Sequence, residues 1–244
     1  MMKLWNRRRK AGQGAHPFCT AIVPAAGSSR RMGGENKLFS DLEGMPVLMR
    51  TLRAVDASEL VDEIVVAAQS EMLLEVADLC RRADLKKSVR VVQGGASRTE
   101  SVLAAAMEAD SRAEYLAIHD GARPLVQPAD FDEVIRYAYQ TYAAAPAVPV
   151  TDTIKVADES GRIVRTPDRS TLRAVQTPQV FQANILKAAL LRACEDGAAV
   201  TDDCAAVERF GKQVYLIGGN TENIKITTPV DLVIAAAILK KRGQ

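Results

Sequence analysis

The sequence is poor in the side chains that bind structural metals. It contains only two histidines, His16 and His119, and its four cysteines form no Cys-x-x-Cys pair. A tetrahedral zinc site needs several such ligands at close, regular spacings, so the sequence argues against a zinc centre. The cysteines lie in apolar or helical contexts that indicate packing instead. They are Cys19, Cys80, Cys194 and Cys204.

Long apolar runs and an export signal are also missing. The most apolar helix candidate, residues 230–239, is shorter than the ~18 residues that a membrane span needs. The basic N-terminus is followed by the polar, glycine-rich residues 11–16, whereas an export signal has an apolar stretch of about 7–15 residues there. We therefore expect a cytoplasmic protein with reduced thiols and no membrane partner.

An excess of positive charge is present only at the N-terminus. The net charge is +2, but five of the 32 basic residues fall within residues 1–10, which leaves 27 basic against 30 acidic residues. A mildly acidic body argues against nucleic-acid binding. We interpret residues 1–17 as a basic, flexible extension, in preference to a nucleic-acid arm or a membrane-surface patch.

Hydrophobic residues make up 48% of the 244 residues, which is enough for a sizeable core. Short β-branched runs alternate with amphipathic helical patterns, which predicts an α/β fold with a doubly wound, mostly parallel sheet over residues 18–244. In such sheets, ligands bind beyond the carboxyl ends of the strands. The expected strands are residues 20–23, 63–67, 89–92, 115–118, 147–150 and 214–217, and the expected helices are 46–55, 71–83, 99–109 and 128–144.

Residues 151–176 interrupt this alternation. A polar strand at 153–156 and a second at 162–165 flank a turn that contains Gly161, a pattern typical of a β-hairpin. The hairpin is too polar for the core. It is either an arm that reaches over a site or a partner subunit, or an ordinary surface hairpin.

The segment after the first strand, residues 24–37, carries small residues together with Arg31 and Lys37. Small residues allow close backbone approach to a ligand, and successive N–H groups with two fixed cations suit a triphosphate. The segment matches neither the dinucleotide-binding glycine motif nor the P-loop. Taken alone, a small-residue loop with basic residues is more often just a turn.

Four further segments carry candidate groups, two of them at strand ends. Asp120 follows the fourth strand, where a carboxylate can bind Mg²⁺ beside phosphates; the alternative is a turn or helix-capping aspartate. Gly94 and Gly95 precede a helix, and the glycines with the helix N-terminus can hold a planar base through backbone groups. The alternative is a glycine turn with Ser97 as the helix cap. Lys225 lies between two isoleucines and either extends from an edge to solvent or points at an anion. Thr201 is a candidate cap of a later helix.

Together these segments resemble, in order, the 2-C-methyl-D-erythritol 4-phosphate cytidylyltransferases of the non-mevalonate isoprenoid pathway. The resemblance extends over residues 20–239. Each motif alone is weak, and the ordered set is specific. The matching segments are residues 24–27, 31–32, 36–37, 94–98 with Ser101, 119–124, 153–155, 176–179, 201–202 and 223–225.

The resemblance implies a Rossmann-like nucleotidyltransferase that uses CTP, a divalent metal such as Mg²⁺ and a polyol phosphate. It implies a homodimer, because the family brings the counterpart of Arg169 to the site on a neighbouring subunit's arm. The implied catalytic residues are Arg31, Lys37, Lys225 and Arg169. The implied nucleotide-binding residues are Ala25, Ala26, Gly27, Gly94, Gly95, Ala96, Ser101 and Asp120. The implied substrate-binding residues are Arg123, Asp120, Arg169 and Thr201, with Asp120 also the metal ligand.

One departure and two alternatives accompany this resemblance. Ser29 stands where the family loop usually has glycine, and a serine at positive φ would be strained. A cytidylyltransferase for another polyol phosphate, such as ribitol 5-phosphate, would share the fold and the phosphate loop. A non-catalytic nucleotide sensor is the alternative of another class, although a pure binder need not keep every cation around the α-phosphate.

Overall fold

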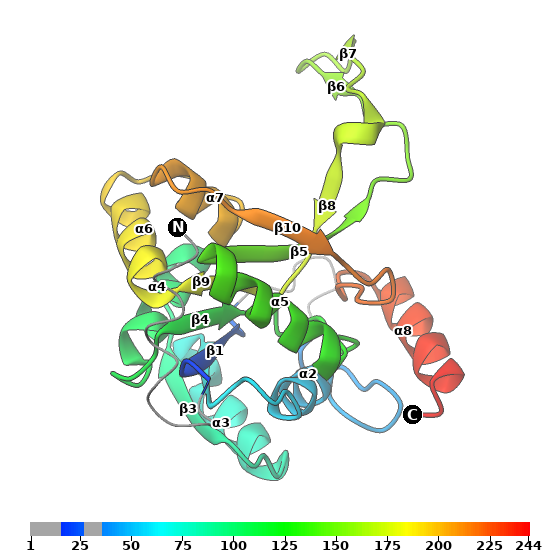
Figure 1. Cartoon of the computed structure of the whole chain (residues 1–244). Coiled ribbons are helices and arrows are strands. Elements are labelled where there is room, and N and C mark those ends of the chain that lie inside the picture. Colours follow the sequence, from blue (N-terminus) through cyan, green and yellow to red (C-terminus); the bar gives the residue numbers. More distant parts are fainter. Residues whose placement is uncertain (1–15, 27–35) are drawn as a thin grey trace.

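The computed structural model describes residues 16–26 and 36–244. Its centre is an eight-stranded sheet in the order β10-β5-β9-β4-β1-β2-β3, with β8 paired to β5 (Figure 1). The strands are β1 (Cys19–Pro24), β2 (Glu63–Ala68), β3 (Ser88–Gln93), β4 (Tyr115–Ile118), β5 (Ala143–Pro149), β8 (Arg173–Val175), β9 (Gln179–Gln182) and β10 (Tyr215–Gly218).

Parallel pairing dominates this sheet. The four strands β3, β2, β1 and β4 are parallel to one another, and β10 is parallel to β5. Strand β9 is antiparallel to both β4 and β5 and lies between them. The topology confirms the predicted doubly wound, mostly parallel sheet, and it brings the carboxyl ends of β1 to β4 to one edge.

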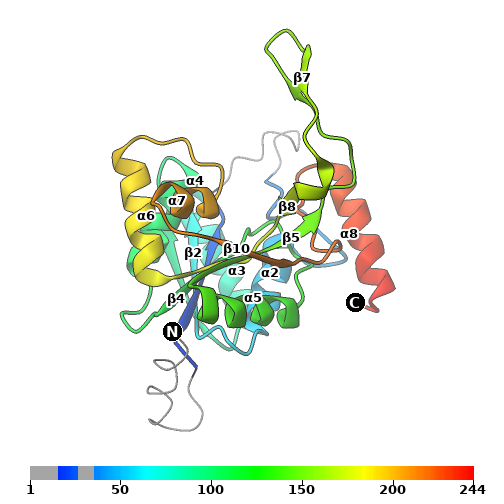
Figure 2. The ribbon, with the colours of Figure 1, turned by 45° about the horizontal axis from the view of Figure 1, so that its top comes forward.

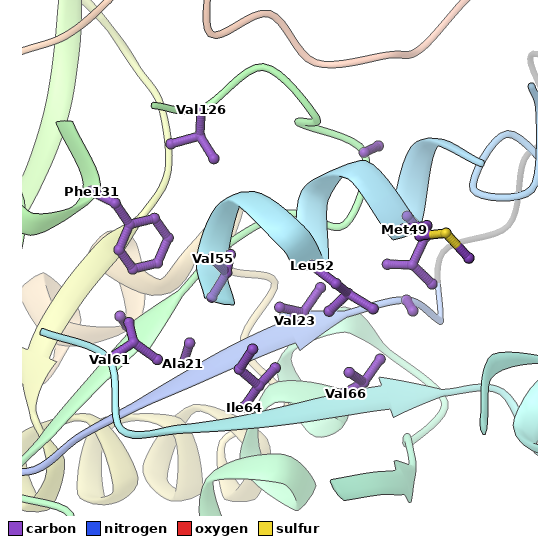
Figure 3. Packing of buried hydrophobic residues seen from close by; sticks show 14 of the residues in the cluster. Ala21, Val23, Met49, Leu52, Val55, Val61, Ile64, Val66, Val126 and Phe131 are labelled. Atoms are coloured by element: carbon purple, nitrogen blue, oxygen red, sulfur yellow. The ribbon is translucent and has the colours of Figure 1, made fainter. Parts of the chain in front are cut away.

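Helices cover both faces of the sheet. Because successive side chains of a strand point to opposite faces, Val23 and Ile64 pack with α2 (Val47–Asp56) on one side, as Figure 3 shows, whereas Ile22 and Val65 join a second core on the other. The first core also receives α3 (Leu73–Arg82), α5 (Pro128–Thr141) and α8 (Pro229–Lys241). The second receives α4 (Arg98–Glu108), α6 (Ala183–Glu195) and α7 (Asp203–Arg209).

The sequence prediction was wrong at the start of the fifth strand. The expected helix 128–144 ends at Thr141, where Tyr142 turns the chain with a φ of 67°, and β5 begins at Ala143. Alanine favours helices, but pairing with β9 and β10 outweighs this local preference. Strand β9 was not expected at all, since its polar Gln179 and Gln182 resemble a loop.

The first strand of the hairpin was expected at residues 153–156 but begins only at Val156. The hairpin of β6 (Val156–Ala157) and β7 (Ile163–Arg165) is otherwise confirmed, with Gly161 at a φ of 83° in its turn. It forms a two-stranded sheet of its own and stands well away from the body (Figures 1 and 2). We call residues 151–176 the arm. The prediction for residues 1–17 lies outside the described residues, apart from His16 and Pro17. In the parts of the chain that the structure describes, no helix is long and apolar enough to cross a membrane.

Candidate active site

A cleft of about 440 Å³ opens at the carboxyl ends of β1 to β4. It lies where a parallel sheet is expected to bind its ligand. Several segments far apart in the sequence meet in it, including Lys37, Asp120 and Lys225. The residues that line it are Pro24, Ala26, Lys37, Leu38, Gln69, Gly95, Ala96, Ser97, Arg98, Ser101, Asp120, Gly121, Ala122 and Lys225.

Asp120 is surrounded by three cations. The Nζ of Lys225 lies 2.8 Å from its Oδ2, the Nε of Arg123 lies 3.6 Å from the same oxygen, and the Nη2 of Arg98 lies 3.6 Å from Oδ1. Burial alone would raise the pKa of this carboxyl, but the nearby charges of Lys225, Arg98 and Arg123 outweigh burial and hold the pKa well below its usual range. Asp120 is therefore a fixed negative charge in a cleft rich in positive charge.

The turn that carries Asp120 is fastened by a buried hydrogen-bond chain. The Asp120 N–H donates to Thr177 Oγ1 at 3.1 Å, and the His119 ring contacts Thr177 Oγ1 at 2.9 Å and the Arg123 carbonyl at 3.2 Å. A carbonyl only accepts, so His119 carries its proton on Nε2, and its bare Nδ1 accepts from the Thr177 hydroxyl. The side chain of His119 is fully buried, so this histidine is a core residue.

This neutral histidine makes the fold sensitive to acid. Burial lowers the pKa of His119 from 6.5 to about 4, so between these values only the unfolded chain takes up the proton. Neutral His119 therefore adds fully to the free energy of unfolding above pH 6.5, and about 2 kcal/mol of this contribution is lost at pH 5.

The wild-type free energy of unfolding should thus be lower at pH 5 than at pH 7 by an amount that includes these ~2 kcal/mol. We expect His119→Gln, whose amide can still donate to the Arg123 carbonyl, to remove about this part of the difference. Urea unfolding of both proteins at the two pH values, without nucleotide or metal, measures this difference. An equal pH dependence of the unfolding free energy in the variant and the wild type would contradict the prediction.

The loop between β3 and α4 combines a helix cap with a surface for a ligand. Ser97 caps α4 by accepting the Glu100 N–H at 3.1 Å, as one of the two sequence interpretations expected. Ser101 Oγ accepts the Gly95 N–H at 3.1 Å. A Cβ on Gly94 would lie 2.7 Å from this Oγ, and one on Gly95 would collide with Glu100. Both glycines are thus required by close packing, and the loop they form lines the cleft.

Lys225 points at an anion rather than to solvent. Ile226 beside it is fully buried and donates its N–H to the Ala122 carbonyl, which ties this segment to the Asp120 turn. Arg123 strengthens the tie, because its Nη1 donates to the Asn223 carbonyl at 2.7 Å. The side chain of Arg123 is 12% exposed and is largely committed to Asp120 and this loop.

Five described residues that the sequence grouped with the site do not line the cleft. Ala25, Gly94 and Arg123 are next to residues that do, whereas Arg169 and Thr201 are not. Arg169 is on the arm, where it donates to the Thr151 carbonyl and lines a separate groove of about 680 Å³ at the arm's base. Thr201 is exposed and does not line the cleft. Its prediction as a helix cap was wrong, because Asp202 caps α7 by accepting the Ala205 N–H at 2.9 Å. Gly27, Ser29 and Arg31 lie outside the described residues.

Several residues that hold the site together were not assigned a role from the sequence. Arg98 and Gln69 line the cleft. Thr177, just before β9, accepts the Asp120 N–H, and Gln179, in β9, accepts the Asp203 N–H. Arg98 bridges the carboxylates of Asp120 and Asp203. Arg98 belonged to a motif that sequence analysis singled out, but its partners are distant in the chain. Gln69 carries no signal beyond its place after a strand.

Comparison with known proteins places the chain in a family. The family model described as "IspD: 2-C-methyl-D-erythritol 4-phosphate cytidylyltransferase" matches residues 19–241. A protein of that name from Symbiobacterium thermophilum is 45% identical over 226 residues, covering 92% of this chain and 94% of the relative. One from Caldanaerobacter subterraneus subsp. tengcongensis is 43% identical, covering 91% and 99%. The crystal structure of 4-diphosphocytidyl-2C-methyl-D-erythritol synthase from Anaerococcus prevotii is 29% identical, with a TM-score of 0.82 over 91% of this chain and 96% of that one. The chain belongs to the 2-C-methyl-D-erythritol 4-phosphate cytidylyltransferase family.

Proposed function

We infer that this protein transfers CMP from CTP to 2-C-methyl-D-erythritol 4-phosphate in isoprenoid precursor synthesis. The products are 4-diphosphocytidyl-2-C-methyl-D-erythritol and pyrophosphate. The observation that carries the inference is the family match over residues 19–241. The cleft supports it, because Lys37, Asp120 and Lys225 line one hollow at the strand ends.

The chemistry requires charge neutralisation more than a base. An oxygen of the acceptor's phosphate monoester attacks the α-phosphorus of CTP, and the bond to the pyrophosphate oxygen breaks in line with it. The attacking oxygen is already anionic, so no proton must be removed. The barrier is the repulsion between two anions, which preorganised cations lower. We assign this role to Lys37 and Lys225, which both line the cleft, and Arg31 joins them in the proposal on sequence grounds.

We assign the base and ribose of CTP to the loops at the ends of β1 and β3. We assign Gly94, Gly95, Ala96 and Ser101 to the cytosine, since the two glycines keep this backbone free of side chains. Ala25 and Ala26 follow β1, and Ala26 lines the cleft; with Gly27 they are assigned to the nucleotide. Asp120 is assigned to the ribose side and to the metal.

Mg²⁺ suits this donor set. The ion takes oxygen ligands and is commonly bound through one or two carboxylates, water and substrate phosphates. Asp120 lines the cleft, and its Oδ1 lies 3.6 Å from Arg98, outside hydrogen-bond distance. Within residues 16–26 and 36–244, no group of three His, Cys, Asp or Glu side chains is arranged to hold a metal, so CTP and water would supply the other ligands. When bound, the ion neutralises phosphate charge.

The acceptor's phosphate is assigned to Arg123, Thr201 and Arg169. Arg169 is carried by an arm that stands away from its own body (Figure 2). Arg169 also lies outside the cleft of its own chain. Both facts support a homodimer in which each arm completes the partner subunit's site.

Mixing two inactive variants tests this assignment. If Arg169 acts on the partner subunit, a mixed dimer of Arg169→Ala and Lys37→Ala contains one intact site, because the intact arm serves the intact cleft. Random reassortment of equal amounts should then restore about a quarter of wild-type turnover. The control is a mixture of Lys37→Ala and Lys225→Met, whose defects lie in the same cleft and should not complement. No recovery from the first mixture, with mixed dimers demonstrated, would contradict the shared site.

The reaction itself is tested by pyrophosphate release from CTP, Mg²⁺ and 2-C-methyl-D-erythritol 4-phosphate. Ribitol 5-phosphate, UTP and ATP serve as parallel controls. Release that requires CTP and the methylerythritol substrate is expected. Faster release with ribitol 5-phosphate would change the assigned acceptor, and tight CTP binding without release from any pair would favour a nucleotide sensor.

A further inference from the structure

Arg98 bridges two carboxylates from distant parts of the chain. It is the first residue of α4, and its side chain lines the cleft with 32% exposure. Its Nη2 donates to Asp203 Oδ2 at 2.8 Å and lies 3.6 Å from Asp120 Oδ1. Burial alone would lower the pKa of Arg98, but the charges of Asp203 and Asp120 outweigh burial and raise it. The guanidinium is therefore a permanent charge between the two acids.

Asp203 depends on Arg98 for its charge balance. Its side chain is 1% exposed, and its Oδ1 has no hydrogen-bond partner among the described residues. Burial raises the pKa of this carboxyl. An isolated charge is costly in such surroundings, and Arg98 is the cation that contacts it in the described structure.

Gln179 fixes Asp203 to the central sheet. This residue begins β9, and its Oε1 accepts the N–H groups of Asp203 and Cys204, both at 3.1 Å. Its Nε2 donates to Asp202 Oδ2 at 2.8 Å. The start of α7, two residues after Thr201, is thus held rigidly, and Arg98 connects it with Asp120 in the cleft.

We propose that Arg98 and Asp203 are positioning residues that hold Asp120 and the segment carrying Thr201 in one fixed frame. This rests on the proposed function, in which Asp120 belongs to the nucleotide and metal and Thr201 to the acceptor's phosphate. The ion pair then aligns the two substrates for in-line attack. Misplacement of reacting groups by about 1 Å can cost about 10²-fold in rate.

Two variants separate positioning from stability. Arg98→Met leaves Asp203 buried without its partner, and we expect it to lower kcat about 10- to 100-fold and to lower Tm by about 10 °C. The double variant Arg98→Met/Asp203→Leu removes both charges, and replacing a buried ion pair by apolar groups is often neutral for stability. We expect its Tm to return close to the wild-type value while kcat remains low.

Arg90 provides a matched control. Its Nη2 lies 3.0 Å from Oε1 of Glu63, whose side chain is 4% exposed, and neither residue lines the cleft. Arg90→Met should therefore lower Tm with kcat unchanged. KM for CTP and for the acceptor are measured alongside, and we expect Arg98→Met to raise both because the frame serves both substrates.

Each outcome decides the proposal. If the wild type is active and the kcat of Arg98→Met lies within threefold of the wild-type kcat, the positioning role is overturned and the proposed function stays intact. Recovery of kcat together with Tm in the double variant would make the pair purely structural and would also overturn it. A folded wild type that is inactive with every substrate pair would overturn the proposed function and this proposal with it.

Discussion

Asp120→Asn is expected to lower kcat/KM for cytidylyl transfer by about 10³-fold, at the upper end of the loss seen when one preorganised oxyanion donor is removed. Asparagine keeps the size of the side chain but not its charge. Lys225, Arg98 and Arg123 would then face one another without the anion that they share. The carboxylate assigned to Mg²⁺ would be lost in the same step. Steady-state pyrophosphate release with saturating Mg²⁺ measures the effect.

The control for this variant is Asp110→Asn. Asp110 also pairs with an arginine, at 2.7 Å from Arg112, but it does not line the cleft. Its substitution should leave kcat/KM unchanged. Turnover of Asp120→Asn within tenfold of the wild type, from protein with an unaltered unfolding transition, would remove Asp120 from the centre of the site.

The first four strands could be predicted because their local and tertiary preferences agree. Residues 63–68, for example, are buried throughout and form β2 as a nearly continuous apolar run. The failures fall where the two preferences differ. Residues 143–147 are mostly alanine and favour a helix locally, but they pair with strands that come later in the chain. Strand β9 owes its place between β4 and β5 to pairing over more than 30 residues, which no local pattern encodes.

The candidate site was also predictable only in part. Loops that follow buried strands could be expected to meet at one edge of the sheet, and Lys37, Gly95 and Asp120 do line one cleft. The contacts that fix the Asp120 turn and Arg98 were not predictable, because they join residues that are 57 and 105 positions apart: Thr177 Oγ1 accepts the Asp120 N–H, and Arg98 pairs with Asp203. A single sequence gives the kind of residue at each loop but not its partner.

Lys225→Met is expected to lower kcat by about 10²- to 10³-fold with a smaller change in KM. Lys225 is assigned two tasks: its charge opposes the negative charge that gathers at the α-phosphorus, and its Nζ holds Asp120 Oδ2 at 2.8 Å. Methionine keeps most of the length of the side chain but not its charge. The control is Lys240→Met, since Lys240 is 71% exposed and contacts Glu43 on the surface.

A double-mutant cycle with Asp120→Asn separates the two tasks of Lys225. Residues that act as one unit give non-additive losses. If Lys225 acts mainly by holding Asp120, the double variant should be no slower than Asp120→Asn alone. If it acts mainly on the α-phosphorus, the two losses should multiply. We expect a result between these limits, because 40% of the Lys225 side chain stays exposed at the cleft while its amine contacts Asp120. A kcat of Lys225→Met within threefold of the wild type would contradict both tasks, and charge neutralisation would then rest on Lys37 and the metal.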